Sequence, residues 1–473
     1  MNIGFDFYCD ETPLLFEASK LFHDNINIFG VSMGQRYKEY WQGINSVHSI
    51  SNYIEEYWND INISIESIKE IEERYRITNL SFFIISDRYL CKLDYEYSLK
   101  ILIGNFLFYE DFFKTNKIDV FIDTPAAILS QLVCYHVAKK NSVKYLAIRV
   151  TRNKNPTFTF INDWQDNWYR MIETYKKDNF DKNSLNEAKN EYLDFINIDS
   201  KPSYMSAPKQ FNKIQLVFIK EFYKRLKKYY LDKQYLDKYD YITQNPFWYV
   251  NRDLKKIMRS KYQNIIHSKI FDNVDISKPY YLFPLHLQPE ASTLMMAPNY
   301  VNQIATIENI AKTLPGGHYL YVKEHTSSYG IHNNEFYSKI KSISNVKLIS
   351  PFFNTRQLIN NCIAPIVLTS TVGWEALLLG KPVVVLGEVF YNSSGLTYHV
   401  KKIDDLSEVL SKQIILYKLN KDKLFKFISA INMTSYKGNF SPATFREKEI
   451  LSNENIFDIY YGIKKEINNA IQN

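Results

Sequence analysis

The chain has 473 residues, of which 45% are hydrophobic, 16% aromatic and 23% charged. This composition is typical of a globular protein with two or three domains of about 150 residues, and it excludes disordered and collagen-like chains. Lys and Arg number 58 against 51 Asp and Glu, a net charge of +7. Spread over this length, the excess suits an anionic small substrate or an acidic membrane surface and does not indicate a nucleic-acid partner.

The start of the chain and its cysteines favour a cytoplasmic protein. The first residues lack the basic and apolar segments of a signal peptide. No stretch approaches the ~18 apolar residues that cross a bilayer. The four cysteines (Cys9, Cys91, Cys134 and Cys362) are widely spaced, which favours a reducing compartment over a disulfide or zinc framework. We expect a protein that is soluble or peripheral on the cytoplasmic face of the inner membrane.

Residues 1–165 are predicted to form a Rossmann-like domain. Short apolar runs predict strands at 5–8, 27–32, 81–86, 119–124 and 144–149. Helices are expected at 13–22, 64–76, 94–115 and 127–141. Because helical crossovers join parallel strands, the sheet should be parallel.

Residues 166–275 are predicted to form a helical region between two domains. Its stretch 220–239 carries seven basic and three acidic residues. One interpretation is a patch for a membrane surface or a polyanion. The other is an ordinary solvated helix whose rim is covered by lysine stems and which packs four side chains inward: Phe222, Leu226, Tyr229 and Tyr230.

Residues 276–400 are predicted to form a second Rossmann-like domain. Strands are expected at 280–287, 318–324, 346–350, 365–370 and 382–387. Helical periods lie between them, most clearly over 301–314. The remaining residues, 401–473, are expected to be helical.

Polar side chains follow three strands of this second domain. They are Gln288 and Glu290 after the first strand, Lys323 and His325 after the second, and Ser370, Thr371 and Glu375 after the fourth. Ligands of parallel α/β sheets bind outside the carboxyl ends of the strands. Each group also has an ordinary explanation, as a polar strand end, a histidine in a surface turn or a capped buried helix.

Together these strand ends predict a pocket for a nucleotide phosphate. Ser370 can cap a helix whose first N–H groups bind an anion. His325 and Lys323 can hold phosphate oxygens. Glu375, one turn into the helix, is within reach of a ribose diol.

The segments FPLHLQPEAS (283–292), YVKEH (321–325) and LTSTVGWEALLLGKPVVVLG (368–387) resemble the capsule polysaccharide biosynthesis proteins, a bacterial family that includes the Kdo transferases. The stretches 122–127 and 147–149 are similar to the N-terminal half of that family. The resemblance implies a GT-B fold, in which two Rossmann-like domains face a cleft. It also implies metal-independent sugar transfer, with the donor nucleotide in the second domain and the acceptor mainly at the first.

The resemblance also implies roles for particular residues. In relatives that use CMP-linked sugars, a His-Pro pair and a Ser-Ser/Thr pair hold the cytidylate phosphate. His325 and Ser370-Thr371 would do so here. Because this chain has Thr326 where those relatives have proline, another nucleotide sugar is an alternative donor.

Sugar transfer needs a carboxylate or an imidazole near the acceptor hydroxyl. The N-terminal strand ends offer Asp6, Asp10, Glu11 and Asp123, and the last three are candidates beside His325. Asp123 should face the cleft, or else cap the helix after it. Arg149 and Arg152 follow the last strand of this domain and could bind an acceptor phosphate or carboxylate, or form surface ion pairs.

These patterns predict a glycosyltransferase of capsule or surface polysaccharide biosynthesis. It would move a sugar, Kdo-like or sialic-like, from a nucleotide donor, CMP favoured, to a glycan or glycolipid. No cofactor or metal is expected, because no D-x-D follows a strand and the nine histidines form no H-x-x-x-H pair. The alternatives are a nucleotide-sugar epimerase and a non-catalytic binding component of a capsule assembly complex.

Overall fold

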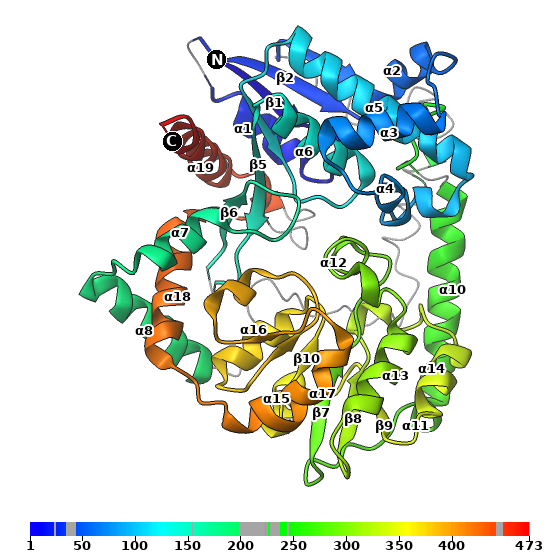
Figure 1. Cartoon of the computed structure of the whole chain (residues 1–473), viewed down its shortest axis with the longest axis vertical. Helices are drawn as coiled ribbons and strands as arrows, with labels where there is room; N and C mark the ends of the chain where they lie inside the picture. The colour runs from blue at the N-terminus through cyan, green and yellow to red at the C-terminus, as the bar shows by residue number, and fades with distance from the viewer. Residues whose placement is uncertain are drawn as a thin grey trace.

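The chain forms two α/β lobes, which lie one above the other in Figure 1. This computed structural model describes residues 1–22, 25–34, 44–153, 155–197, 223, 226–227, 237–243, 246–440 and 448–472. The N-terminal part builds the upper lobe, the segment from 267 to about 417 builds the lower lobe, and the C-terminal helix returns to the upper one.

The upper lobe is built on a seven-stranded sheet with the order β13-β6-β5-β4-β1-β2-β3. Its strands are β1 (Asn2–Asp6), β2 (Asn27–Ser32), β3 (Ser46–Ser49), β4 (Val120–Asp123), β5 (Lys144–Val150), β6 (Thr157–Ile161) and β13 (Tyr436–Lys437). The strands from β1 to β5 are parallel, whereas β6 and β13 join the edge in antiparallel pairs. The strand order reverses between β1 and β4, where a Rossmann-like sheet opens a crevice at its carboxyl ends.

Helices cover both faces of this sheet. They are α1 (Thr12–Ser19), α2 (Ile50–Tyr57), α3 (Ile65–Tyr75), α4 (Ser81–Ile85), α5 (Tyr95–Thr115) and α6 (Leu129–Lys140). On one face Phe5 packs in a core with α1 and the C-terminal helix, and on the other Phe121 packs against Phe112 and Phe113 of α5. Burial of these apolar faces supplies most of the driving force for folding of the lobe.

The prediction of a strand at 81–86 is wrong, because these residues form the short helix α4. The side-chain oxygen of Asn79 accepts a hydrogen bond from Ser81 N at 2.8 Å and starts the turn. Ile85 is exposed, so the run is not a buried strand. A short apolar run does not distinguish a strand from a helix by its period.

The lower lobe contains a six-stranded parallel arrangement. Its strands are β7 (Tyr280–Pro284), β8 (Tyr319–Lys323), β9 (Val346–Ile349), β10 (Ile366–Val367), β11 (Val384–Val385) and β12 (Tyr398–His399). Two three-stranded sheets meet where Leu282 pairs with Pro365 and its N–H donates to Ala364 O at 3.1 Å. The order is therefore β9-β8-β7-β10-β11-β12, a Rossmann order that reverses between β7 and β10. The five predicted strands are present, and β12 was not predicted.

The helices of the lower lobe connect these strands. They are α11 (His267–Ile270), α12 (Ala291–Leu294), α13 (Gln303–Thr313), α14 (Asn334–Lys341), α15 (Thr355–Asn361), α16 (Thr371–Leu378) and α17 (Leu406–Glu408). α12 follows the carboxyl end of β7 and lies beside the boundary with the upper lobe in Figure 1. This carboxyl edge of the lower sheet therefore faces the upper lobe.

Four helices link or flank the two lobes. They are α7 (Tyr169–Lys177), α8 (Lys182–Asn197), α10 (Pro246–Ile265) and α18 (Lys421–Thr434). Three of them lie within 166–275, the segment predicted to be helical, whereas its basic stretch 220–239 falls largely outside the described residues. At this junction the rings of Trp168 and Phe390 stack with their centroids 4.3 Å apart.

The end of the chain completes the upper lobe. α19 (Asn453–Gln472) packs on α1, and the buried carboxylate of Glu466 lies 2.6 Å from both Arg170 Nη1 and Tyr436 OH. The expectation that 401–473 contains helices alone is therefore incomplete, because β13 extends the first sheet. Two strand residues are too few to give a period that sequence can show.

Candidate functional site

The reversal point of the lower sheet gathers the polar strand ends that the sequence singled out. β7 lies between β8 and β10. The chain after β7 is therefore flanked by the predicted site residues that follow β8 and by those that follow β10. Two strand spacings, about 10 Å in total, separate β8 from β10. His286 follows the middle strand and was not among the predicted site residues.

His286 is a buried imidazole, and one of its ring nitrogens has no hydrogen-bond partner. Its backbone is fixed on both sides by Gln303, which accepts from His286 N at 2.7 Å and donates to His286 O at 3.1 Å. Its Nε2 is buried and has no hydrogen-bond partner. Burial, with a smaller contribution from the nearby His325, lowers the pKa of His286 to about 3. The ring is therefore neutral and can make one further hydrogen bond.

His325 begins the 3-10 turn Thr326–Ser328 after β8. Its Nδ1 accepts a hydrogen bond from Ser327 N at 3.2 Å. Burial lowers the pKa of His325, Lys323 and Lys256 lower it further, and the adjacent Glu324 opposes them. A neutral imidazole that accepts at Nδ1 carries its proton on Nε2. The ring is thus oriented to donate a hydrogen bond from Nε2.

Lys323 and Glu324 support this turn from within the lobe. Lys323 is buried and donates to Pro351 O at 3.0 Å. Glu324 is fully buried, and its carboxylate accepts from His332 Nδ1 at 2.9 Å. Lys256 of α10 donates to Ser327 O at 2.8 Å and secures the other side of the turn. Lys323, which is predicted to contact a phosphate, thus already has a hydrogen-bond partner within the protein.

Ser370 is the N-cap of α16, as predicted. Its Oγ accepts from Val372 N at 3.2 Å, and its carbonyl accepts from Tyr391 OH at 2.7 Å. Tyr391 reaches this carbonyl only because position 373 is glycine, where a Cβ would lie 2.4 Å from the hydroxyl oxygen. Thr371 is the first residue of the helix and is partly exposed. The helix start therefore presents N–H groups beside two hydroxyls.

Glu375 is buried one turn further along α16, and its Oε1 has no hydrogen-bond partner. Burial raises the pKa of Glu375 to about 7, although Arg356 and Lys323 oppose the rise. With a pKa of about 7, the carboxyl group of Glu375 can be protonated or charged at neutral pH. Its unpaired oxygen could therefore donate a hydrogen bond to a ligand hydroxyl or accept one from it. This state is compatible with the diol contact predicted from sequence.

The loop after β7 connects the site to the upper lobe. Gln288 donates to Val301 O at 2.8 Å and so holds its own loop. Burial raises the pKa of Glu290, while a hydrogen bond from Ser292 and the charge of Arg88 partly offset the rise. Arg88 belongs to the upper lobe, and its Nε is buried without a partner. Glu290 and Arg88 therefore lie near one another at the boundary between the lobes.

The upper lobe has its own polar cluster at the carboxyl ends of β1 and β4. Asp6 and Asp123 are fully buried there and share a hydrogen bond. Gln131 Nε2 lies 3.2 Å from Asp123 Oδ1 and 3.3 Å from Asp6 Oδ2, and Tyr145 donates to Asp123 Oδ2 at 3.0 Å. Burial and the nearby Asp6 raise the pKa of Asp123 well above its ordinary value. The pair therefore keeps a proton.

The expectation that Asp123 faces the cleft is wrong, because its side chain is fully buried. It is not the cap of α6 either. Asp87 takes that role from a distant loop, since its Oδ2 accepts from Leu129 N at 2.7 Å. Asp10 is exposed and Glu11 half-buried on the loop after β1. Of the three predicted acids, these two are therefore the ones in contact with solvent.

Arg149 and Arg152 lie near the junction of the lobes. Arg149 Nε is 2.9 Å from Asp166 Oδ1, and the other oxygen of Asp166 accepts from Phe390 N at 3.3 Å. Burial raises the pKa of Tyr391 in the lower lobe; the charge of Asp166 raises it further, and that of Arg152 opposes the rise. Arg149 thus has an ion-pair partner that bridges the lobes, and its predicted contact with an acceptor stays a prediction.

Sequence reasoning placed Asp6 and His286 at strand ends but left both out of the predicted site residues, and it did not consider Arg88. His286 and Asp6 occupy the ends of strands that flank the two reversal points, so the strand order, once known, would have selected them. Arg88 lies in the turn after α4, and nothing in the sequence around it indicated a position near the lower lobe.

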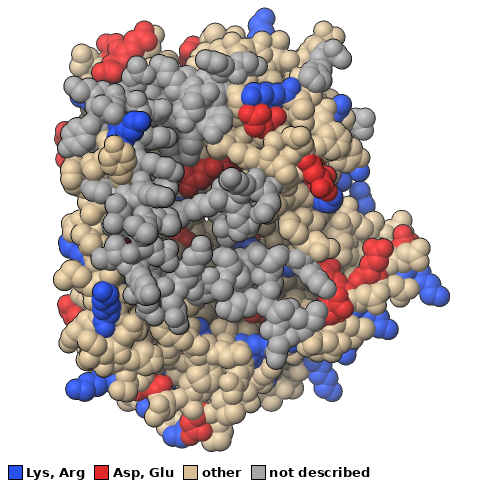
Figure 2. Space-filling view, turned by 180° about the vertical axis from the view of Figure 1, so that it is seen from behind, with Lys and Arg blue, Asp and Glu red and all other residues tan. Residues whose placement is uncertain are grey.

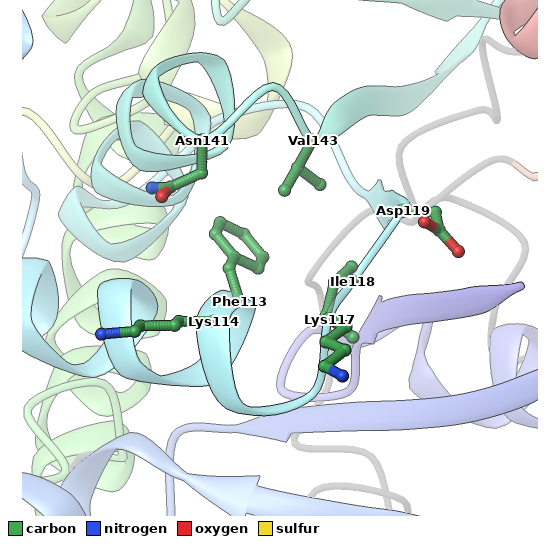
Figure 3. A pocket seen from close by; sticks show the side chains of 7 residues that line it. All are labelled: Phe113, Lys114, Lys117, Ile118, Asp119, Asn141 and Val143. Atoms are coloured by element: carbon green, nitrogen blue, oxygen red, sulfur yellow. The ribbon is translucent and has the colours of Figure 1, made fainter.

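Two hollows of the surface lie away from these strand ends. One, of about 340 Å³, is lined by Phe113, Lys114, Lys117, Ile118, Asp119, Asn141 and Val143 (Figure 3). Asp119 and Val143 precede β4 and β5, so this hollow is at the amino edge of the sheet, opposite the edge where ligands bind. The other, of about 420 Å³, is lined by Asn153, Asn155, Thr157, Glu187, Asn190, Glu191, Asp194, Asn432 and Ser435.

Two further features are absent from the described ranges. In that part of the chain, no three His, Cys, Asp or Glu side chains gather as metal ligands. No helix among the same residues is both long and apolar enough to cross a bilayer.

The fold and the site define a two-lobed protein of the GT-B type, with two Rossmann-like sheets whose reversal points carry polar clusters. Residues 203–434 match the family model for capsule polysaccharide biosynthesis proteins. This matched region is just under half of the chain and contains every predicted donor residue. The segments 122–127 and 147–149 lie outside it.

Solved structures with a similar fold include two kinds of enzyme. KpsC of Thermosulfurimonas dismutans, a beta Kdo 2,7 transferase, is 14% identical, with 78% of this chain and 97% of that chain covered and a TM-score of 0.40. UDP-GlcNAc 2-epimerase of Neisseria meningitidis, bound to UDP-GlcNAc, is 12% identical over the whole of both chains, with a TM-score of 0.30. No curated protein matches the chain.

Proposed function

We propose that the chain is a glycosyltransferase of capsule or surface polysaccharide biosynthesis. It transfers a sugar, Kdo-like or sialic-like, from a nucleotide donor to a glycan or glycolipid. The observation that carries the proposal is the convergence of His286, His325 and the start of α16 at the reversal point of the lower sheet. This arrangement presents hydrogen-bond donors where the charge of a leaving nucleotide would develop.

The donor phosphate would lie across the end of β7. His325 Nε2 and the hydroxyls of Ser370 and Thr371 would approach it from opposite sides, with His286 Nε2 between them. Glu375 would hold the ribose. We favour CMP as the nucleotide, because single-phosphate recognition suits two imidazoles and one helix start better than the longer, more charged diphosphate does.

No resident metal or cofactor enters this proposal. The leaving charge would be met by hydrogen bonds from His325 and α16 and by the positive charge of Lys323. Activity that is unchanged by EDTA would agree with this assignment.

The acceptor would bind at the upper lobe. Asp10 or Glu11, which contact solvent on the loop after β1, would take the proton of its hydroxyl. Asp123 would stabilise the fold of this region and would not be the base, because a buried, protonated carboxyl group cannot accept a proton from a substrate. Arg149, Arg152 and Arg88 would meet a negative group of the acceptor at the boundary between the lobes.

The proposal is tested by incubating the purified protein with a panel of nucleotide sugars, with and without acceptor glycans, and measuring the released nucleotide. Transfer from one donor is expected. Asp10→Ala or Glu11→Ala should lower turnover and leave nucleotide affinity intact. Glu66→Ala, an exposed acid of α3, is the matched control.

Other outcomes of this assay would contradict the proposal. Isomerisation of the sugar without release of nucleotide would indicate an epimerase. Nucleotide binding without any reaction, together with intact capsule production by the Asp10 and Glu11 variants, would indicate a binding component.

A further inference from the structure

α10 lies along one edge of the molecule (Figure 1). Several large apolar side chains of this helix are exposed and form a stripe. The stripe consists of Phe247, Leu254, Met258, Tyr262 and Ile265, and Met258 and Ile265 are 71% and 82% exposed. Their spacing places them on one side of the helix. At 1.5 Å per residue, the stripe is about 27 Å long.

A helix that packs on a core buries its apolar face, whereas α10 exposes its apolar face and buries polar side chains. Its buried side chains include Ser260 and Gln263. Gln263 donates to His332 O at 2.8 Å and accepts from Gly330 N at 3.2 Å, and Arg259 donates to Ile331 O at 2.8 Å. Polar contacts thus hold α10 on the lower lobe and turn its apolar side outward.

Basic residues flank the stripe. α10 carries five Lys and Arg and one acid, Asp253, which is 2.8 Å from Arg252. By helical geometry, Lys255 lies along one side of the stripe and Lys261 along the other, and both are exposed. In the view from behind, the Lys and Arg side chains that can be seen lie singly or in small groups among other residues (Figure 2).

We propose that α10 lies on the surface of a membrane that contains anionic lipids. Its apolar stripe would enter the boundary between headgroups and acyl chains, while the flanking cations would contact the negative headgroups. Self-association through this stripe is disfavoured, because two copies would bring their rows of Lys255 and Lys261 together. The charge of the stripe's borders therefore selects an anionic lipid surface as the partner.

This surface would place the candidate site near the membrane. Lys256 faces the other way and holds the turn that contains His325. A helix fixed on the bilayer would thus bring the donor turn close to a lipid-linked acceptor. The inference goes beyond the proposed function, since vesicle binding requires neither a donor nor turnover.

The test is co-sedimentation of the full chain with phosphatidylcholine vesicles, with and without phosphatidylglycerol. Binding is expected only with the anionic lipid and should weaken at high salt. Replacing Leu254, Met258 and Ile265 together by Gln should weaken it at least about tenfold, and Lys255→Gln with Lys261→Gln should weaken it further. The matched control is Ile415→Gln with Leu416→Gln, which removes two apolar side chains that are 75% and 80% exposed elsewhere.

A second measurement does not depend on variants. Hydrogen exchange of the wild type should slow in α10 when anionic vesicles are added. Absence of vesicle binding, equal binding by the stripe variant, or protection outside α10 alone would overturn the proposal. So would a stable dimer that the stripe variant converts to a monomer, since that would identify a second copy as the partner.

Discussion

The carboxyl groups of Asp6 and Asp123 share a hydrogen bond at the reversal point of the upper sheet, although β1 and β4 are far apart in the sequence. Thr124 N donates to Asp123 Oδ1 at 2.7 Å, and Tyr8 N donates to Asp6 Oδ1 at 2.9 Å. Two buried carboxylates this close cannot both be charged, so one keeps its proton. The pair fixes the loops that carry Asp10 and Glu11.

Replacing Asp123 by Ala should lower the free energy of unfolding by about 2–4 kcal/mol, because it leaves Asp6 and the Tyr145 hydroxyl buried without a partner. Asp123→Asn should cost less than about 1 kcal/mol, since a neutral amide can still donate to Asp6. Urea unfolding measures both. If Asn is as destabilising as Ala, Asp123 is charged in the folded protein, and if Asn abolishes turnover, the acid is catalytic.

Glu375 should make stability depend on pH. Its pKa is raised to about 7 by burial, so the folded state binds this proton more tightly than the unfolded state. The contribution of Glu375 to the free energy of unfolding should therefore fall as pH rises from about 4.5 to above 7, by about 2–4 kcal/mol in total. Urea titrations of wild type and Glu375→Gln across this range measure it. A difference between the two proteins that does not change with pH would contradict the assignment.

Gly373→Ala tests the contact that positions the start of α16. The new Cβ would lie 2.4 Å from Tyr391 OH and displace the hydroxyl from Ser370 O. A loss of about 1–3 kcal/mol of stability is expected, together with weaker nucleotide binding. Gly316→Ala, where a Cβ would meet nothing within 4 Å, is the control and should change stability by less than about 0.5 kcal/mol. Equal melting temperatures for the two variants would contradict the model of the site.

Much of the lower lobe could be predicted because its parallel strands are continuous apolar runs with polar residues directly after them. β8 (Tyr319–Lys323) begins and ends within one residue of its prediction. The positions of Lys323, His325 and Ser370 on one sheet edge followed from that pattern. What the pattern did not contain was strand order, which places His286 between the two predicted groups.

The upper lobe was harder to predict for physical reasons. β3 (Ser46–Ser49) and β13 (Tyr436–Lys437) are short, and partners far along the chain stabilise them. The burial of Asp123 is also a tertiary effect, produced by Asp6, Gln131 and Tyr145 from three other segments. Sequence placed Asp123 at a strand end but contained no signal for the side chains that enclose it.

The most direct test of the candidate site is calorimetric titration of CMP, UDP and GDP into wild type, His325→Ala and His318→Ala. His318 lies at the amino end of β8, the strand that His325 follows, and its Nδ1 is 3.1 Å from Pro315 O. One nucleotide should bind the wild type, and His325→Ala should weaken it by about 1.5–3 kcal/mol, as for a lost charge-assisted hydrogen bond, with His318→Ala unchanged. Equal affinity of wild type and His325→Ala, or no binding of any nucleotide to the wild type, would contradict the account.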